Sequence, residues 1–527
     1  MRRAALLLAI AACSSSAPIA RAPGPVTAAP TITNVAPDAA SLVDAWAAAV
    51  GGRDALRALG ALHATGSYEE GGLTGTIDLW ITPRGERREE IVLGPLREVR
   101  VFDGTHGWLV DRNRDVRELA GFELDDQLAL AFREAFAPLL VDRRHGAVTR
   151  DGEKLVLAPD GGNRPETVTL DATTHLPVTF VRRDGEKQRT THVADWSAVG
   201  GARLPFSIRE ETGNPNEAVA IHYKAIERGS PPADLFAKPP EREPDYTLAS
   251  DPVVVPIDVA YGGLIFVKVE VNGRPMSFIL DSGAEFTLLN SSRLGKLGLQ
   301  GIGTFATGAG GGDVVVSYVP HVTTKVGGAT VSDQIVAAVL LDALEGPLQR
   351  PLDGILGYDF ISRFVVEIDY AHQTLRLHDR ATYRHAGTGT AVPITLEDST
   401  PFFDASITVP ERGKLAGHFV LDTGCLCEVQ LFTPFVDTHQ LLTAFPEARQ
   451  AGFSAGAGGA TNQLSATIPA LEIGGQVIEN PQAELARDQQ GATADPENAG
   501  LIGSLVFKRF VLVLDYEAKH AYFDPLP

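Results

Sequence analysis

The stretch Phe278-Ile-Leu-Asp-Ser-Gly-Ala284 occurs a second time in this chain as Phe419-Val-Leu-Asp-Thr-Gly-Cys425. In each copy a run of apolar, strand-like residues leads into an aspartate and a glycine, which are common in tight turns. A single Asp-Ser/Thr-Gly triplet would carry little information, because these residues occur in turns of every kind. Two copies in the same setting indicate that one structural unit has been duplicated.

The duplication extends well beyond these two stretches. Each copy follows an apparent strand pair and precedes a glycine-rich run, and each then reaches a motif of two aliphatic residues and a glycine. After that motif, Arg-Phe-Val and Asp-Tyr recur at the same offsets in both copies. The landmarks of the two copies, in chain order, are Val255-Pro-Ile257, Gly308–Gly312, Gly354-Ile-Leu-Gly357, Arg363 and Asp369, and then Val392-Pro-Ile394, Gly456–Gly459, Gly500-Leu-Ile-Gly503, Arg509 and Asp515.

These paired motifs and their duplication resemble the aspartic peptidases, in the bilobal single-chain arrangement of pepsin but with compact lobes similar to those of retropepsins. The resemblance covers about residues 253–527. It implies a mainly-β, two-lobed aspartic peptidase fold, with lobe 1 at residues 251–381 and lobe 2 at residues 382–527. It also implies that Asp281 and Asp422 converge from the two lobes as the catalytic pair.

The chemistry explains why two aspartates are needed. One carboxylate can deprotonate a water molecule while a protonated neighbour donates to the substrate carbonyl, so no metal and no cofactor are expected. Two close carboxylates share one proton, because like charges cannot both ionise. Gly283 and Gly424 permit tight turns and let backbone groups approach the carboxylates. The resemblance further implies that Ser282 and Thr423 lock the two loops together through their hydroxyl groups.

Other features near the motifs bear on activity. The glycine-rich runs lack the Lys-Ser/Thr of a phosphate-binding loop, and they fit hairpins that close over substrate, one in each lobe. Tyr318 lies near the first hairpin, but the sequence does not align it with the flap tyrosine of pepsin-like enzymes. Two departures from the family pattern are Glu285, an extra acidic residue, and Cys425, where a small residue is usual. Because either could shift the protonation of the pair, a binding-only descendant with an inactive site stays open as an alternative.

The N-terminal residues 1–13 resemble a bacterial lipoprotein signal peptide. Two arginines precede a short apolar run, and Ile10-Ala-Ala-Cys13 matches the site at which the cysteine is lipidated after cleavage. An ordinary secretory signal with a chance cysteine is the alternative. Residues 14–40, rich in Ser, Ala and Pro, are expected to form a flexible tether. No later stretch has the ~20 apolar residues of a membrane span. The expected location is therefore the bacterial cell envelope, lipid-anchored and facing the periplasm or the exterior.

Two cysteines remain if Cys13 carries the lipid. Cys425 and Cys427 are two positions apart, and a disulfide across so short a loop would be strained. Both are therefore expected to be small packing residues rather than a bonded pair. No further metal ligands lie nearby with suitable spacing, so no metal site is expected.

Residues 41–229 combine amphipathic helices with many strand-like segments. One or two helices against a long antiparallel sheet predict an α+β half-barrel, which resembles the lipoprotein-carrier proteins of the periplasm. The resemblance implies an apolar cavity, whereas a spacer or docking domain is the alternative. Residues 230–250, rich in proline and charge, predict an interdomain linker.

The composition narrows the range of partners. A net charge of −20 argues against nucleic acid, which requires a basic surface. The expected partners are a peptide or protein substrate and, through the lipid anchor, the membrane, with a monomeric peptidase unit. The leading function is an aspartic endopeptidase, a hydrolase that cleaves extended protein segments. The alternative is a lipid- or lipoprotein-binding envelope module whose peptidase-like half is inactive or regulatory.

Overall fold

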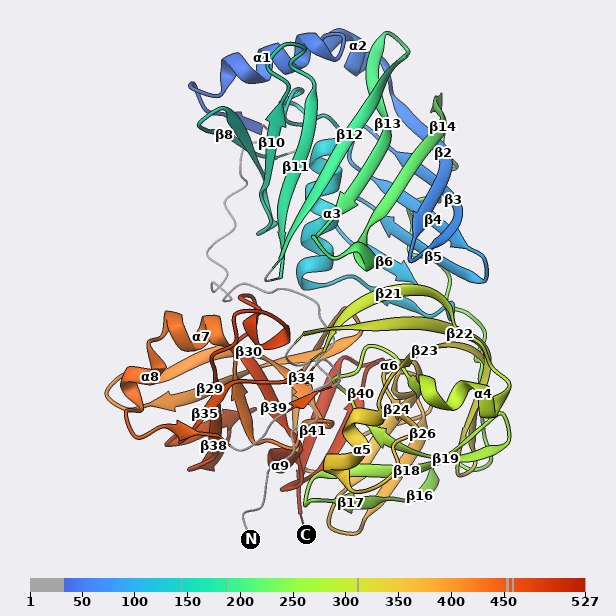
Figure 1. Ribbon diagram of the computed structural model, residues 1–527, viewed down its shortest axis with the longest axis vertical. Helices are drawn as coiled ribbons and strands as arrows, with labels where there is room; N and C mark the ends of the chain where they lie inside the picture. The colour runs from blue at the N-terminus through green and yellow to red at the C-terminus, as the bar shows by residue number, and fades with distance from the viewer. Residues whose placement is uncertain are drawn as a thin grey trace. The chain divides into compact units, whose positions relative to one another are not determined.

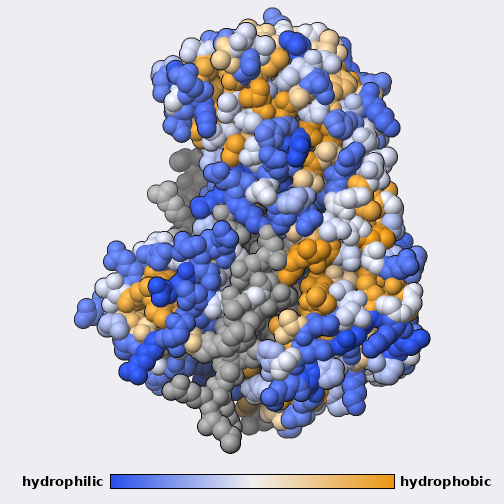
Figure 2. Space-filling view, viewed as in Figure 1, coloured by the Kyte–Doolittle hydropathy of each residue, from blue (hydrophilic) through white to orange (hydrophobic). Residues whose placement is uncertain are grey.

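The computed structural model of the chain describes residues 33–143, 145–185, 187–309, 312–451, 455–456 and 459–526. This described part divides into two compact units, an N-terminal one that ends at Arg242 and a C-terminal one that begins at Glu243. Both are built mainly from strands, so the chain is a multi-domain, mainly-β protein (Figure 1). Hydrophilic and apolar residues are intermixed over the visible face of each unit (Figure 2). Among the described helices, none is long and apolar enough to cross a membrane.

The N-terminal unit is a curved 14-stranded sheet with the helices α1, α2 and α3. Its strands follow the order β1-β8-β9-β10-β11-β12-β13-β14-β2-β3-β4-β5-β6-β7. Only the first pair, β1 and β8, runs parallel among these neighbours. The bounds are β1 Thr33–Val35, α1 Ala40–Ala49, α2 Arg53–Ala58, β2 Ala61–Glu70, β3 Leu73–Ile81, β4 Arg87–Leu93, β5 Leu96–Phe102, β6 Gly107–Val110, β7 Val116–Glu118, α3 Gly121–Glu134, β8 Gly146–Asp151, β9 Lys154–Pro159, β10 Glu166–Leu170, β11 Pro177–Asp184, β12 Lys187–Val199, β13 Ala202–Glu211 and β14 Val219–Gly229.

The space between α3 and the sheet of the N-terminal unit contains paired charges. Helix α3 lies within the curve of the sheet (Figure 1). Arg87 on β4 bonds Glu134 at 3.0 Å, and Arg133 on α3 bonds Glu166 on β10 at 2.9 Å. Both arginine–glutamate pairs are largely shielded from solvent. Buried ion pairs are costly to separate, because each charge would be left without its partner. An acyl chain could therefore occupy this space only without separating the two arginine–glutamate pairs.

The Pro-rich segment 230–250 does not form a free linker along its whole length. Phe236 is 8% exposed and packs with Val99 and Val101 of the N-terminal unit. Its other end forms β15, Tyr246–Leu248, which pairs with β23 of the C-terminal unit. Apolar side chains inside a proline-rich stretch gain free energy by burial, which the composition alone does not reveal.

Each repeat of the C-terminal unit contains one large sheet, and the two large sheets have similar strand orders. The first follows β15-β23-β20-β24-β19-β18-β22-β21, with β17 beside β18. The second follows β32-β35-β38-β31-β39-β30-β29-β36-β37, with β28 beside β29. Thus β24-β19-β18 in the first sheet corresponds to β39-β30-β29 in the second.

The remaining bounds of the first repeat are β16 Val253–Pro256, β17 Asp258–Ala260, β18 Leu264–Val271, β19 Arg274–Leu280, β20 Leu288–Asn290, α4 Leu294–Leu297, β21 Ile302–Ala309, β22 Gly312–Val326, β23 Ala329–Val339, α5 Asp342–Leu348, β24 Gly354–Leu356, α6 Tyr358–Ile361, β25 Phe364–Asp369 and β26 Thr374–Asp379. Those of the second repeat are β27 Thr390–Pro393, β28 Thr395–Glu397, β29 Thr400–Val409, β30 Gly413–Asp422, β31 Val429–Leu431, α7 Thr433–Thr438, α8 Leu441–Ala444, β32 Arg449–Gln450, β33 Ala455–Gly456, β34 Gly459–Ala460, β35 Gln463–Thr467, β36 Ala470–Ile473, β37 Gln476–Glu479, β38 Gln482–Ala486, β39 Gly500–Gly503, α9 Ser504–Phe507, β40 Phe510–Asp515 and β41 His520–Pro525.

A six-stranded sheet joins the two repeats, in the order β16-β26-β25-β40-β41-β27. Its first three strands come from the first repeat and its last three from the second. At its centre β25 and β40 run antiparallel, with Val366 opposite Leu514 and Ile368 opposite Leu512. One apolar core includes residues of both repeats, so the two halves of the C-terminal unit pack as one body.

The two aliphatic-Gly motifs lie beside the strands that end in the two aspartates. Gly354–Leu356 pairs in parallel with Phe278–Leu280, and Gly500–Gly503 pairs in parallel with Phe419–Asp422. Ile355, Leu356, Leu501 and Ile502 are fully buried. These residues are therefore core residues that support the two aspartate loops, as their apolar character predicts.

Candidate active site

The two Asp-Ser/Thr-Gly loops meet between the sheets of the C-terminal unit. Asp281 follows β19 and Asp422 ends β30, and both are fully buried. Each carboxylate accepts a hydrogen bond within its own loop, from the Gly283 amide at 2.9 Å and from the Gly424 amide at 2.8 Å. These bonds hold each carboxylate against the turn that follows it.

Each glycine of these loops contacts the carboxylate of the other repeat. A Cβ atom added to Gly283 would lie 2.8 Å from the Asp422 carboxyl carbon. A Cβ added to Gly424 would lie 2.3 Å from the carboxyl carbon of Asp281. Both values are shorter than a carbon–carbon contact, so only glycine leaves room for the carboxylates to approach each other.

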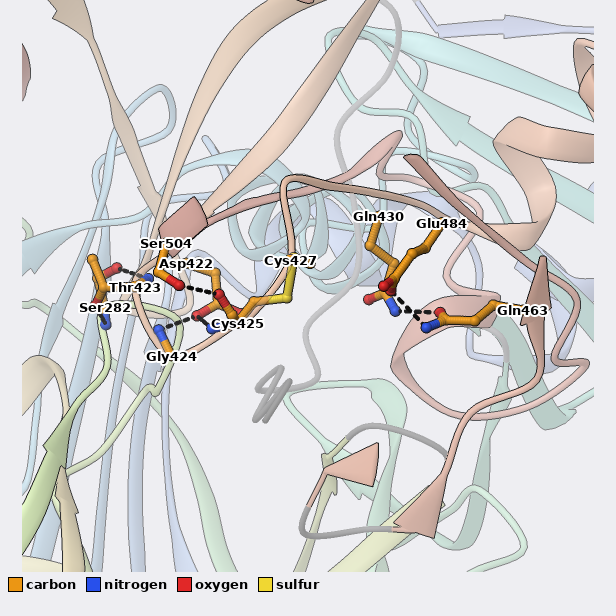
Figure 3. Close-up of a disulfide and its surroundings, with 10 residues drawn as sticks. All are labelled: Ser282, Asp422, Thr423, Gly424, Cys425, Cys427, Gln430, Gln463, Glu484 and Ser504. Atoms are coloured by element: carbon orange, nitrogen blue, oxygen red, sulfur yellow. Dashed lines mark hydrogen bonds between the residues drawn. A yellow bond between two sulfur atoms is a disulfide. The ribbon is translucent and has the colours of Figure 1, made fainter. Parts of the chain in front are cut away.

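The hydroxyl groups of Ser282 and Thr423 connect the two loops by four hydrogen bonds. The Ser282 hydroxyl donates to the Leu421 carbonyl at 2.7 Å and accepts from the Thr423 amide at 3.0 Å. The Thr423 hydroxyl donates to the Leu280 carbonyl at 3.1 Å and accepts from the Ser282 amide at 3.0 Å. Figure 3 shows Ser282 and Thr423 facing each other. The arrangement is reciprocal, so each loop fixes the position of the other.

The electrostatics of the pair favour one shared proton. Burial raises the pKa of Asp281 well above its ordinary value, and the charge of Asp422 raises it further. Burial raises the pKa of Asp422 to about 6, whereas its bonds from Asp281 and from two backbone amides lower it. Those amides belong to Gly424 and to Cys425, the latter at 3.0 Å. Because both pKa values are raised by burial and the two groups are coupled, one proton is shared between Asp281 and Asp422.

Cys425 and Cys427 are joined by a disulfide, so the expectation of two unbonded packing residues is wrong (Figure 3). Their Cα atoms are 5.4 Å apart, within the range that a disulfide spans. The chain can achieve this across a single intervening residue because the aspartate loop curves sharply at this point. Both cysteines are at most 2% exposed. The disulfide is therefore a buried part of the second aspartate loop.

Ser504 anchors the same loop from α9, and sequence reasoning did not identify it. Its hydroxyl and its amide both donate to the Cys425 carbonyl, at 2.7 and 2.9 Å. The corresponding residue of the first repeat is Tyr358, whose amide donates to the Ala284 carbonyl at 2.9 Å. Counting from the aligned glycines of the two repeats would have revealed this correspondence.

The predicted hairpins lie partly outside the described residues, because positions 310–311 and 457–458 are among those not described. In the first repeat β21 and β22 form a long antiparallel hairpin. Tyr318 on β22 contacts Phe305 and Phe286, with ring centroids 5.0 and 6.1 Å apart. The tyrosine therefore belongs to an aromatic cluster beside the first aspartate loop. Glu285 is 5% exposed, so the extra carboxyl of this loop is buried.

A chain of polar side chains in the second repeat, with Gln430 and Gln463 buried and Glu484 partly buried, was also missed from the sequence. The Gln430 amide donates to Gln463 at 2.7 Å, and Gln463 donates to the Glu484 carboxylate at 2.6 Å (Figure 3). Burial raises the pKa of Glu484 to about 8, although the bond from Gln463 lowers it. These residues are distant in sequence and come together only because β31, β38 and β35 are neighbours.

Glu484 should make the stability of the fold depend on pH. Its folded pKa of about 8 exceeds the ordinary glutamate value of 4.5, so the folded state binds the proton more tightly than the unfolded state does. The resulting stabilisation is complete below about pH 4.5 and is lost as the pH rises through about 8. Glu484→Gln keeps an acceptor for Gln463 without the titration. Between pH 5 and 8 the wild type should lose on the order of 2 kcal/mol relative to this variant. Chemical denaturation at several pH values measures this, and parallel curves for the two proteins would contradict it.

Cys13 lies outside the described residues. Among the described residues no group of three or more His, Cys, Asp or Glu side chains is arranged to hold a metal ion. The donor set at the aspartate pair consists of two carboxylates that face each other, which suits proton sharing.

Comparison with known proteins relates the first repeat to a family. The model of the aspartyl protease family matches residues 267–360, which include Asp281. The chain is also 27% identical over 125 residues to DNA damage-inducible protein 1 of Kluyveromyces lactis. That match covers 23% of this chain and 27% of the yeast protein, so the chain spans about a quarter of its relative's length. Residues 267–360 are thus an aspartyl protease-like region.

Proposed function

We propose that the C-terminal unit is an aspartic endopeptidase whose catalytic pair is Asp281 and Asp422. The observation that carries this proposal is the close approach of the two buried carboxylates, each against the glycine of the opposite loop. Two carboxyl groups in such an arrangement hold one proton between them, which provides an acid and a base at one site. The aspartyl protease-like region that contains Asp281 supports the same reaction class.

In the proposed mechanism Asp422 acts as the base and Asp281 as the acid. A water molecule attacks the peptide carbonyl carbon while Asp422 takes a proton from the water and Asp281 gives its proton to the carbonyl oxygen. The resulting gem-diol then returns a proton to Asp281 as it re-forms a carbonyl, the C–N bond breaks, and Asp422 protonates the leaving nitrogen. Both carboxyl groups end in their starting protonation states, and no covalent intermediate is needed.

Extended protein segments are the substrates that this site suits. Strand β21 is the last strand of its sheet, so its outer edge can pair with an extended chain. Such pairing provides affinity, and neighbouring pockets provide side-chain selectivity. The aromatic cluster of Phe286, Phe305 and Tyr318 is available as one wall for an apolar side chain.

The experiment that tests this proposal is hydrolysis of a mixture of extended peptides by the purified full chain. Cleavage should continue in the presence of metal chelators and serine-directed reagents. It should stop with peptide analogues that carry a hydroxyl group at the scissile position, because these mimic the gem-diol. Cleavage that a chelator abolishes, or that the hydroxyl analogue leaves unchanged, would refute the proposed chemistry.

We also propose that the protein is lipid-anchored in a bacterial cell envelope through Cys13. The Cys425–Cys427 disulfide supports a compartment outside the reducing cytosol. We expect the wild-type protein to partition with membranes and to carry acyl mass, and Cys13→Ser to be soluble or uncleaved. Equal membrane partitioning of both proteins, without acyl mass on the wild type, would contradict the anchor.

The alternative of a lipid- or lipoprotein-binding module finds less support in the N-terminal unit. A bound acyl chain requires an apolar chamber. Among the described residues, the space around α3 contains the paired charges of Arg87, Glu134, Arg133 and Glu166. The peptidase is therefore the function that we carry forward.

A further inference from the structure

Two tyrosines occupy equivalent positions beside the six-stranded sheet that joins the repeats. Tyr370 directly follows β25, and Tyr516 directly follows β40. These strands pair antiparallel about the approximate two-fold axis that relates the repeats, with Asp369 opposite Val511. Each tyrosine is 6% exposed. The duplication therefore places one buried phenol on each side of the axis.

The hydroxyl groups of both tyrosines are buried and have no hydrogen-bond partner among the described residues. A buried hydroxyl without a partner is destabilising, and phenylalanine would fill the same space without that cost. Both repeats nevertheless carry tyrosine, although the repeats differ at neighbouring positions such as Tyr358 and Ser504. Buried polar groups that lack a protein partner usually bind an internal water molecule. The hydroxyls of Tyr370 and Tyr516 are therefore positioned to hold water.

The tyrosine rings are tied to the aspartate loops. Tyr516 stacks on Tyr358, with ring centroids 6.0 Å apart and an interplanar angle of 16°. The amide of Tyr358 donates to the Ala284 carbonyl in the first aspartate loop at 2.9 Å. The ring of Tyr516 is thus one residue removed from the loop that contains Asp281. In the second repeat Ser504 takes the place of Tyr358 and donates to the equivalent carbonyl, of Cys425.

The electrostatics show which charged groups lie close to the two hydroxyls. Burial raises the pKa of Tyr516, and the charge of Asp281 raises it further. Burial raises the pKa of Tyr370 likewise, and there the added charge is that of Asp422. The carboxylate whose charge acts on each tyrosine is thus that of the opposite repeat. In both carboxylates the Oδ2 atom is buried and accepts no hydrogen bond from an N–H or hydroxyl group of the described residues.

We propose that Tyr370 and Tyr516 are positioning residues for the catalytic pair, and that each hydroxyl holds a bound water that hydrogen-bonds the carboxylate of the opposite repeat. A donor on each side of the pair stabilises the singly protonated state, which the reaction needs, against the doubly protonated state. This inference rests on the proposed function for its consequence in catalysis, but the hydrogen bonds themselves do not depend on peptide hydrolysis.

The test compares Tyr370→Phe and Tyr516→Phe, each in the full chain, by ¹³C carboxyl NMR of labelled aspartate across pH. The signals of the pair are assigned by their loss in the Asp281→Asn and Asp422→Asn proteins. Each phenylalanine variant should raise the pH at which the pair loses its first proton by roughly 0.5 to 1 unit, the effect of one net hydrogen bond to the ionised state. The acidic limb of kcat should shift in the same direction, with KM unchanged.

Tyr223→Phe is the matched control, because Tyr223 is a partly buried tyrosine of the N-terminal unit whose pKa desolvation also raises. It should leave the titration of the pair unchanged. If the hydroxyls of Tyr370 and Tyr516 bind no water, both phenylalanine variants should unfold at a higher temperature than the wild type. The titration of the aspartate pair should then be unchanged, and this result would overturn the inference. A wild type that titrates as described but cleaves no peptide would refute the peptidase and retain the tyrosine assignment. Active enzyme with an unmoved titration in both variants would refute the tyrosine assignment alone.

Discussion

Replacing Asp281 or Asp422 by asparagine is expected to lower the rate of peptide hydrolysis by at least ~10²- to 10⁴-fold, the usual contribution of one acid or base. Asparagine is almost the same size as aspartate, and its side-chain oxygen can still accept the hydrogen bond from the glycine amide of its own loop. The asparagine side chain cannot act as an acid or a base, because its amide neither gains nor loses a proton near neutral pH. Because each carboxyl needs the other, the double variant should be little worse than either single variant. Steady-state turnover of the three variants measures this.

The stability of the asparagine variants provides the control. Burial raises the pKa of Asp422 to about 6, so the wild-type fold loses stability as the pH rises from the unfolded value of 3.8 through about 6. Asp422→Asn lacks this loss and should be at least as stable as the wild type at pH 7. A well-folded Asp422→Asn protein that cleaves at the wild-type rate would show that the pair is structural.

Replacing Gly424 or Gly283 by alanine should lower the rate of peptide hydrolysis almost as much as removing one of the carboxylates. A Cβ at Gly424 would lie 2.3 Å from the Asp281 carboxyl carbon, and one at Gly283 would lie 2.8 Å from that of Asp422. Either the carboxylate or the loop must move, and both movements separate the pair. A displacement of about 1 Å in a catalytic group can cost ~10²-fold in rate. We expect Gly424→Ala to lose more activity than Gly283→Ala, because its contact is the shorter one.

Gly295→Ala is the matched control for these two variants. A Cβ at Gly295 meets no atom within 4 Å, so this substitution should leave both turnover and stability close to the wild type. The loss at Gly424 and Gly283 should appear mainly in kcat, since the displaced groups are those that transfer protons. Full activity in Gly424→Ala would show that the carboxylates do not approach each other as the structure places them.

The sequence was informative wherever a physical requirement restricts the residue type. The close approach of two carboxylates admits only glycine at positions 283 and 424, and the loop connection uses a hydroxyl at Ser282 and Thr423. These requirements fall on consecutive residues, so the motif is readable as a string. The duplication then indicated that two such loops exist in one chain.

The sequence was less informative where the outcome depends on distant neighbours. The Cys425–Cys427 disulfide forms because the aspartate loop curves enough to bring the two Cα atoms to 5.4 Å, which residue spacing does not state. The Pro-rich segment 230–250 contains Phe236, which is buried against strand β5. Composition describes the average environment of a segment, whereas burial depends on which apolar surface lies beside each side chain.

The duplicated unit, the strands that lead into Asp281 and Asp422, and the residue types of the two loops were readable from the sequence, because local conformation and close contact allow few alternatives there. The surroundings of these loops, and polar groups elsewhere in the unit, depend on the tertiary fold. The tyrosines Tyr370 and Tyr516, the anchor at Ser504 and, away from the pair, the carboxyl of Glu484 reach their places through pairings between strands that are far apart in the chain. Such pairings are set by the packing of the whole sheet, and no local pattern of residues encodes them.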